Sequence, residues 1–135
     1  RYYLECQRFP GLMRSRALNG TLEALSAETG APVVATSDCH YVYARDAEMQ
    51  KILHASHRGS SVDQVSAQWE YGITLNIPAS DDQVWDDLKG TGLSDEAATE
   101  ALLNTGRISD RTGVELPKVE PLRYPIQDED YKPWV

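Results

Sequence analysis

The first third of the chain carries a strand–helix–strand pattern of apolar residues. Residues 2–7 are rich in aromatic and apolar side chains and end at a Phe-Pro-Gly turn, which predicts a short strand. Leucines then recur at i, i+4 and i+7 before Gly30, a typical helix C-cap, which predicts a helix of roughly four turns. The β-branched run at residues 32–36 is typical of a parallel strand that is buried on both faces. We therefore expect a right-handed βαβ unit whose strands are parallel.

The pattern downstream is mainly helical. Asp46 is a plausible N-cap for a helix that ends at Gly59, and residues 69–75 favour a strand. Ser80 begins a capping-box pattern, and Ser94 precedes a second acidic helix start. The two predicted helices place apolar residues on one face each, so the fold class is α/β with a helical second half.

Length, composition and cysteine usage narrow the possible classes of protein. The chain has 135 residues, which is enough for one domain, and 41% of them are hydrophobic. No apolar run approaches the roughly 20 residues that a membrane helix needs, which excludes a bilayer-spanning role. The two cysteines cannot form a disulfide framework, so we expect a soluble protein of the reducing cytoplasm.

The charge is concentrated in the second half. The net charge is −8, with a balance of +1 over residues 1–45 and of −9 over residues 46–135. Because an acidic surface repels phosphate, the second half is a poor candidate for gripping a nucleic-acid backbone alone. The chain also begins without Met inside a predicted strand, which indicates a fragment, although a processed N-terminus gives the same pattern.

Candidate chemistry lies directly after the second predicted strand. Asp38 and His40 follow this strand at its carboxyl end, where ligand-binding groups cluster in parallel α/β folds. Residues two apart in an extended chain point to the same side, so the carboxylate and the imidazole could reach a common ion. An oxygen with a nitrogen ligand suits zinc, manganese or iron better than calcium. By spacing alone, a polar loop without a ligand is the competing interpretation.

A longer pattern surrounds these two residues. The run LSAETGAPVVATSDCHY at residues 25–41 resembles the stretch of bacterial DNA polymerase III alpha subunits in which a helix ending in Gly leads to Val-Ala-Thr-Asn-Asp-x-His-Tyr. Further matches are the Tyr-Tyr-Leu-Glu strand at residues 2–5, the acidic-Ala-Glu pattern at 45–48, Asn-Thr at 104–105 and Val-Glu-Leu-Pro at 114–117. The resemblance is strongest over residues 25–48 and loose over 60–92. Ser37 replaces a common Asn, and residues 56–69 depart from the Ile-Gln-Thr-Gly pattern of the family.

This resemblance implies a particular fold and domain organisation. The matching region of the family is the C-terminal part of the polymerase and histidinol phosphatase (PHP) domain, a distorted seven-stranded β/α barrel, followed by a connection toward the polymerase palm. Residues 1–60 would be the C-terminal strands and helices of the barrel, and residues 61–117 a helical segment that completes the domain and the connection. Residues 118–135, with their prolines, would be an extended linker.

The resemblance also implies a metal site. Asp38 and His40 would be the last two ligands of a metal cluster, one through a carboxylate and one through an imidazole, while the earlier ligands would precede Arg1. The metal would be divalent zinc, manganese or iron and would support phosphoester hydrolysis. Glu5 is a candidate hydrogen-bond partner for one of the ligands, with a surface carboxylate as the alternative. No general base is identifiable, and this segment alone should be inactive.

Three functions follow as expectations. The first is a piece of a replicative DNA-directed DNA polymerase, a nucleotidyltransferase, whose polymerase site would use magnesium outside this segment. Its partners would be the remainder of the alpha chain, the proofreading exonuclease subunit and DNA bound through other domains. The second is a PHP-superfamily metal-dependent phosphoesterase, and the third is a non-catalytic docking module of the replisome. A small phosphatase should end soon after the Asp-x-His helix, whereas this chain continues for 95 residues beyond His40, which favours the first.

Other chemically suggestive residues have structural interpretations. Cys39 is expected to pack away from the two ligands, and Cys6 to be a small buried apolar residue. The histidines at 54 and 57 could share an ion but are more typical of a helix surface near a C-terminus. The aspartates at 81, 82, 86 and 87 are expected on a solvated helix face, and the tryptophans at 69, 85 and 134 in core or interface packing.

Overall fold

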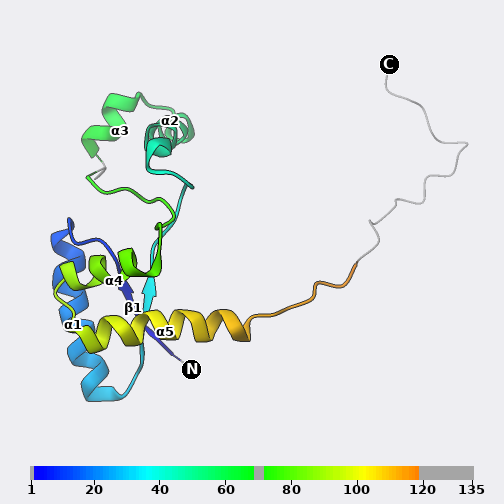
Figure 1. Ribbon diagram of the computed structural model, residues 1–135. Coiled ribbons are helices and arrows are strands. Elements are labelled where there is room, and N and C mark those ends of the chain that lie inside the picture. Colours follow the sequence, from blue (N-terminus) through cyan, green and yellow to red (C-terminus); the bar gives the residue numbers. More distant parts are fainter. Residues whose placement is uncertain (1, 69–71, 119–135) are drawn as a thin grey trace, which may run out of the picture.

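The computed structural model describes residues 2–68 and 72–118, which form a mixed α/β fold that is mostly helical (Figure 1). This result confirms the expected α/β class. The elements in chain order are β1 (Leu4–Gln7), α1 (Met13–Thr29), β2 (Val33–Thr36), the 3-10 turn η1 (Ala44–Asp46), α2 (Ala47–Arg58), α3 (Val62–Gln68), α4 (Asp81–Gly90) and α5 (Asp95–Arg111). No helix within the described ranges combines the length and the apolar character that crossing a membrane requires.

The predicted strand–helix–strand unit is present. β1 and β2 pair in parallel, with Leu4 opposite Val33 and Cys6 opposite Ala35. Helix α1 ends at Gly30, whose φ of 70° is left-handed and whose N–H donates to Ser26 O, as expected for a glycine C-cap. Over the described residues the sheet has two strands. This part of the fold is therefore a single βαβ unit, and the barrel around it stays a prediction.

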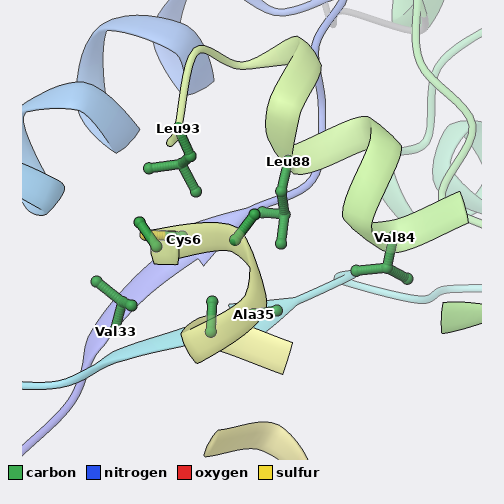
Figure 2. Packing of buried hydrophobic residues seen from close by; sticks show 9 residues of the cluster. Cys6, Val33, Ala35, Val84, Leu88 and Leu93 are labelled. Carbon is green, nitrogen blue, oxygen red and sulfur yellow. The ribbon is translucent and has the colours of Figure 1, made fainter. Parts of the chain in front are cut away.

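One face of this small sheet carries the hydrophobic core. Cys6, Val33 and Ala35 meet Leu88 of α4, and Figure 2 shows these side chains pointing toward one another together with Leu93. The remaining core residues come from the two C-terminal helices: Val84, Ala97, Ala98 and Ala101. Because α5 presents alanines to β2, its backbone lies close to the strand. The periodicity that predicted α4 and α5 thus identifies the surfaces that cover the sheet.

Polar side chains of α5 cover the outer edge of β2. Asn104 is 4% exposed and donates from Nδ2 to the main-chain oxygen of Val33 at 2.8 Å. Thr105 donates from Oγ1 to the main-chain oxygen of Ala35 at 2.9 Å. A strand edge presents carbonyl groups that need hydrogen-bond donors. These two side chains supply donors to the edge of β2 that faces away from β1.

Helices α2 and α3 form a separate end of the molecule (Figure 1). They pack mainly against each other, and their buried residues are Ala55 and Val65. Three large apolar residues of α2 are more than half exposed: Met49, Ile52 and Leu53. The expected α2 is present, and it ends at Gly59 with a left-handed φ of 60°. Its apolar stripe, however, meets little of the chain that the structure describes.

Two details of this end differ from expectation. Asp46 does not cap α2 through its side chain; its carboxylate instead accepts a hydrogen bond from the N–H of Tyr43 at 3.3 Å, because residues 44–46 form η1 first. Helix α3 was not predicted, although Ser61 and Gln64 form a reciprocal capping box at its start. Seven residues are too few for a clear apolar period, so only this box could have indicated the helix.

The predicted strand at residues 69–75 is wrong where the structure describes it. Residues 72–75 belong to no strand, and the region contributes one isolated parallel bridge, between Asn76 and Tyr41. Residues 69–71 lie outside the described residues, as does all but the first residue of the expected linker at 118–135. The segment therefore lies against the loop after β2 as irregular chain and not as a sheet member.

Candidate metal-binding loop

The loop that follows β2 brings Asp38 and His40 together. Asp38 has a φ of 43° and is the one residue other than glycine with a positive φ among those described. Aspartate tolerates this left-handed region better than most residues do, and such conformations often occur at functional loops. The chain therefore turns at Asp38 and is not extended. The expectation that Asp38 and His40 point to the same side of an extended chain was wrong. The two side chains nevertheless lie close, with His40 Nδ1 3.8 Å from Asp38 Oδ1.

A main-chain hydrogen bond orients the imidazole of His40. Its Nδ1 lies 2.7 Å from the main-chain oxygen of Asp38. A carbonyl oxygen can only accept, so Nδ1 carries the hydrogen and donates it. In the neutral imidazole this leaves the lone pair on Nε2, which is the arrangement typical of histidines that bind a metal. The side chain is 39% exposed and that of Asp38 is 53% exposed, so a ligand can reach both.

The donor set that the described residues supply is incomplete. No group of three histidine, cysteine, aspartate or glutamate side chains in the described ranges is close enough to hold a metal ion. Asp38 and His40 offer one carboxylate and one imidazole, which fit zinc, manganese or iron in chemical type. Structural and catalytic zinc sites in proteins usually have at least three protein ligands. The pair is therefore suited to part of a site.

The main chain of residues 75–77 holds this loop in place. The N–H of His40 donates to Leu75 O at 2.7 Å, and the N–H of Ile77 donates to Tyr41 O at 3.2 Å. Leu75 in turn donates its N–H to the Tyr41 hydroxyl at 2.7 Å. Cys39 is exposed, and its Sγ donates to the main-chain oxygen of Asn76 at 3.6 Å, so the expectation that this thiol is packed was wrong. It points toward the segment that docks on the loop.

A partly buried ion pair lies behind this segment, and no sequence pattern predicted it. Arg8 is 4% exposed; its Nη1 donates to Asp87 Oδ2 at 2.7 Å and its Nη2 donates to Asn76 O at 2.8 Å. The prediction that Asp87 belongs to a solvated face was therefore wrong, whereas Asp81, Asp82 and Asp86 are exposed as expected. The partners are 79 residues apart in the chain, and no short-range pattern identifies such a contact.

Glu5 contacts the neighbouring strand. Its Oε1 accepts a hydrogen bond from Thr36 Oγ1 at 2.7 Å, on the exposed face of the sheet. Thr36 is the last residue of β2, two positions before Asp38. Glu5 thus lies at the same end of the sheet as the candidate loop and fixes a side chain of the strand that leads into it. Its role as a partner of a metal ligand stays a prediction.

A cleft of about 700 Å³ adjoins His40. It lies between α2 and residues 73–75, and its wall includes Tyr41, Glu48, Lys51, His54, His57 and Leu75. Lys51 donates to the Glu48 carboxylate at 2.6 Å. His57 is exposed, as expected for a helix-surface histidine, and His54 is half-buried. The three histidines of the chain therefore border one cleft, although they form no three-donor metal group in the described structure.

The remaining candidates are structural. Cys6 is fully buried, as expected, and burial raises the pKa of its thiol to about 11, with smaller contributions from the negative charges of Glu23 and Glu5. Trp85 packs half-buried against the core, and its Nε1 donates to Thr99 Oγ1 at 3.2 Å. The other two tryptophans, at 69 and 134, lie outside the described residues.

Comparison of the chain with protein families, with curated proteins and with solved structures finds no match.

Proposed function

We propose that this chain is a segment of the catalytic alpha subunit of a bacterial-type replicative DNA polymerase, and that it carries the Asp-x-His metal motif of the PHP domain. The observation that supports this most is the position of Asp38 and His40, at the carboxyl end of β2 in a parallel βαβ unit. The same residues lie within the run at 25–48 that resembles the family. Motif and position in the fold agree.

In this proposal Asp38 and His40 hold a divalent metal together with ligands from other parts of a seven-stranded PHP barrel. The metal would activate water and screen the charge of a phosphate. His40 would bind through Nε2, because its Nδ1–H donates to the main-chain oxygen of Asp38. Asp38 would bind through its carboxylate, whose exposed position leaves room for an ion. The chain's own residues thus orient two ligands and leave the remaining positions to others.

The Asn-Thr match supports the same proposal from a second place in the chain. Asn104 and Thr105 are the residues of α5 that donate to the carbonyls of Val33 and Ala35. They connect a helix far along the sequence to the strand that precedes the Asp-x-His motif. Their contacts give the two matched segments a physical reason to occur together in one fold.

The experiment is a primer-extension assay on the complete protein in which this segment occurs, with magnesium and deoxynucleoside triphosphates. We expect template-directed extension. Elemental analysis of the same protein after dialysis should find two or three equivalents of zinc, manganese or iron, and the Asp38→Ala/His40→Ala variant should contain less. A protein that extends no primer under any of these conditions would contradict the polymerase assignment.

The cleft beside His40 favours a second candidate, a metal-dependent phosphoesterase of the PHP superfamily. The cleft joins an apolar wall at Leu53, Ile73 and Leu75 to polar groups near His40, an arrangement that suits a small ligand. In this case the complete protein would hydrolyse a chromogenic phosphoester in the presence of manganese and would not extend a primer. Loss of hydrolysis in His40→Asn, with retention in His57→Asn, would place the reaction at the candidate loop.

A further inference from the structure

Arg8 is a buried charge that makes two directed contacts. It follows β1 directly and is 4% exposed. Its guanidinium donates to Asp87 of α4 at 2.7 Å and to the main-chain oxygen of Asn76 at 2.8 Å. Its Nε is buried and has no hydrogen-bond partner within the described structure. Because an apolar side chain would avoid the cost of burying a charge, these contacts need an explanation beyond stability.

The second contact leads to the candidate metal-binding loop. Asn76 forms the parallel bridge with Tyr41, and the neighbouring Leu75 accepts the N–H of His40 at 2.7 Å. The Asn76 oxygen, which the guanidinium holds, also accepts from Cys39 Sγ. One short segment therefore contacts Cys39, His40 and Tyr41 and is itself held by a buried arginine.

We propose that Arg8 is the positioning residue for the Asp38-x-His40 motif. Asp87 fixes the guanidinium, the guanidinium fixes the main chain at Asn76, and that segment fixes the loop. An arginine suits this task because its planar fork donates in two set directions, whereas the ammonium of a lysine is a single point donor. The inference rests on the proposed role of Asp38 and His40 as metal ligands.

Hydrogen exchange of the main-chain amides tests the proposal on the chain without any metal. In Arg8→Lys, the amides of His40 and Ile77, which donate to Leu75 and Tyr41, should exchange about tenfold faster, as expected when a charge-assisted hydrogen bond is lost. The amides of β2 and α5 should keep their rates. The control is Arg107→Lys, because Arg107 is exposed and donates to Asn104 Oδ1 at 2.9 Å, away from the loop.

Two results would overturn the proposal. An equal acceleration of all protected amides would mean that Arg8 stabilises the whole fold and has no particular relation to the loop. Unchanged exchange rates of the His40 and Ile77 amides would mean that the loop keeps its conformation without the contacts of Arg8. Should Arg8→Lys fail to fold, the unmodified chain provides the test: in increasing denaturant the His40 amide should open together with α4 amides. Opening together with α2 and α3 would contradict the proposal.

Zinc binding separates this proposal from the proposed function. If the complete protein in which this segment occurs binds zinc at His40, Arg8→Lys should raise the dissociation constant about tenfold, because the ligand pair is less well oriented. If the complete protein binds no zinc at this loop but Arg8→Lys still loosens the loop, the metal role fails and the positioning role stands. If zinc binds and Arg8→Lys changes neither its affinity nor the exchange rates, the positioning role fails and the metal role stands.

Discussion

The two ends of the molecule use similar helical patterns with different results. In the α/β body, comprising β1, α1, β2, α4 and α5, the apolar stripes of α4 and α5 meet the sheet, and Leu88 and Leu93 are almost fully buried. In the α2–α3 pair, an equally regular stripe leaves Ile52 and Leu53 at 58% and 63% exposure. The pattern of a helix predicts which face is apolar, and the rest of the fold decides whether that face finds a partner.

The candidate metal-binding loop lies at the junction of these two regions. Its main chain leaves the body at the end of β2 and enters η1 and α2 a few residues later. Residues 75–77 return from α3 along the loop before α4 begins. The loop that carries Asp38 and His40 is thus connected to the α/β body, in part through the contact of Arg8 with Asn76, and to the α2–α3 pair.

The largest expected difference between the regions concerns matched leucines. Leu88→Ala should lower the free energy of unfolding by about 2–5 kcal/mol, because Leu88 is fully buried and its removal leaves a cavity. Leu53→Ala should change it by less than about 0.5 kcal/mol, since most of that side chain is already in water. Urea denaturation followed by circular dichroism measures both. Equal losses would show that the α2–α3 pair belongs to the same core.

The next largest expected effect is a pH dependence of the stability of the α/β body. Folding raises the pKa of the Cys6 thiol from 9.0 to about 11, so the folded state keeps a proton that the unfolded state loses between these values. The contribution of this thiol to the free energy of unfolding should therefore be complete below pH 9 and should decrease by about 2 kcal/mol as the pH rises toward 11. Cys6→Ala should lack this component. The chains with Cys6 and with Cys6→Ala are best compared in a Cys39→Ser background. The same pH dependence of the unfolding free energy in both chains would refute this prediction.

The smallest expected difference in stability concerns two serine N-caps with the same geometry. Ser80 and Ser61 each accept the N–H of a glutamine three residues later at 3.2 Å, one in α4 and the other in α3. Ser80→Ala should lower the global unfolding free energy by about 1 kcal/mol. Ser61→Ala should leave the global value almost unchanged and speed hydrogen exchange only in α3, because that helix opens locally. A global loss in Ser61→Ala would show that the two regions unfold as one.

Local patterns predicted helix starts and helix ends well, for identifiable reasons. Gly30 and Gly59 both take the left-handed conformation expected of helix C-caps, and Ser80 and Ser94 both accept a main-chain N–H at the start of their helices. Each of these signals involves residues within four positions of one another. The parallel pairing of β1 with β2 followed from the helix between them.

Contacts between residues that are far apart in the chain could not be predicted from the sequence. The Arg8–Asp87 pair and the bond from Asn104 to Val33 join positions more than 70 residues apart. The left-handed φ of Asp38 was also not predicted. An extended chain would likewise bring the side chains of Asp38 and His40 close together, so their proximity did not reveal the turn. The sequence identified the two candidate ligands, while their orientation came from the hydrogen bonds of the loop.

The most direct test of the metal role is a zinc titration of the complete protein in which this segment occurs, followed by nitrogen-15 NMR of the rings of His40, His54 and His57. We expect that Nε2 of His40 shifts first, that its Nδ1 keeps its hydrogen, and that Asp38→Asn and His40→Asn each weaken binding while His57→Asn does not. Equal shifts of all three histidines, or a first shift at His54 or His57, would contradict the assignment of Asp38 and His40 as a ligand pair.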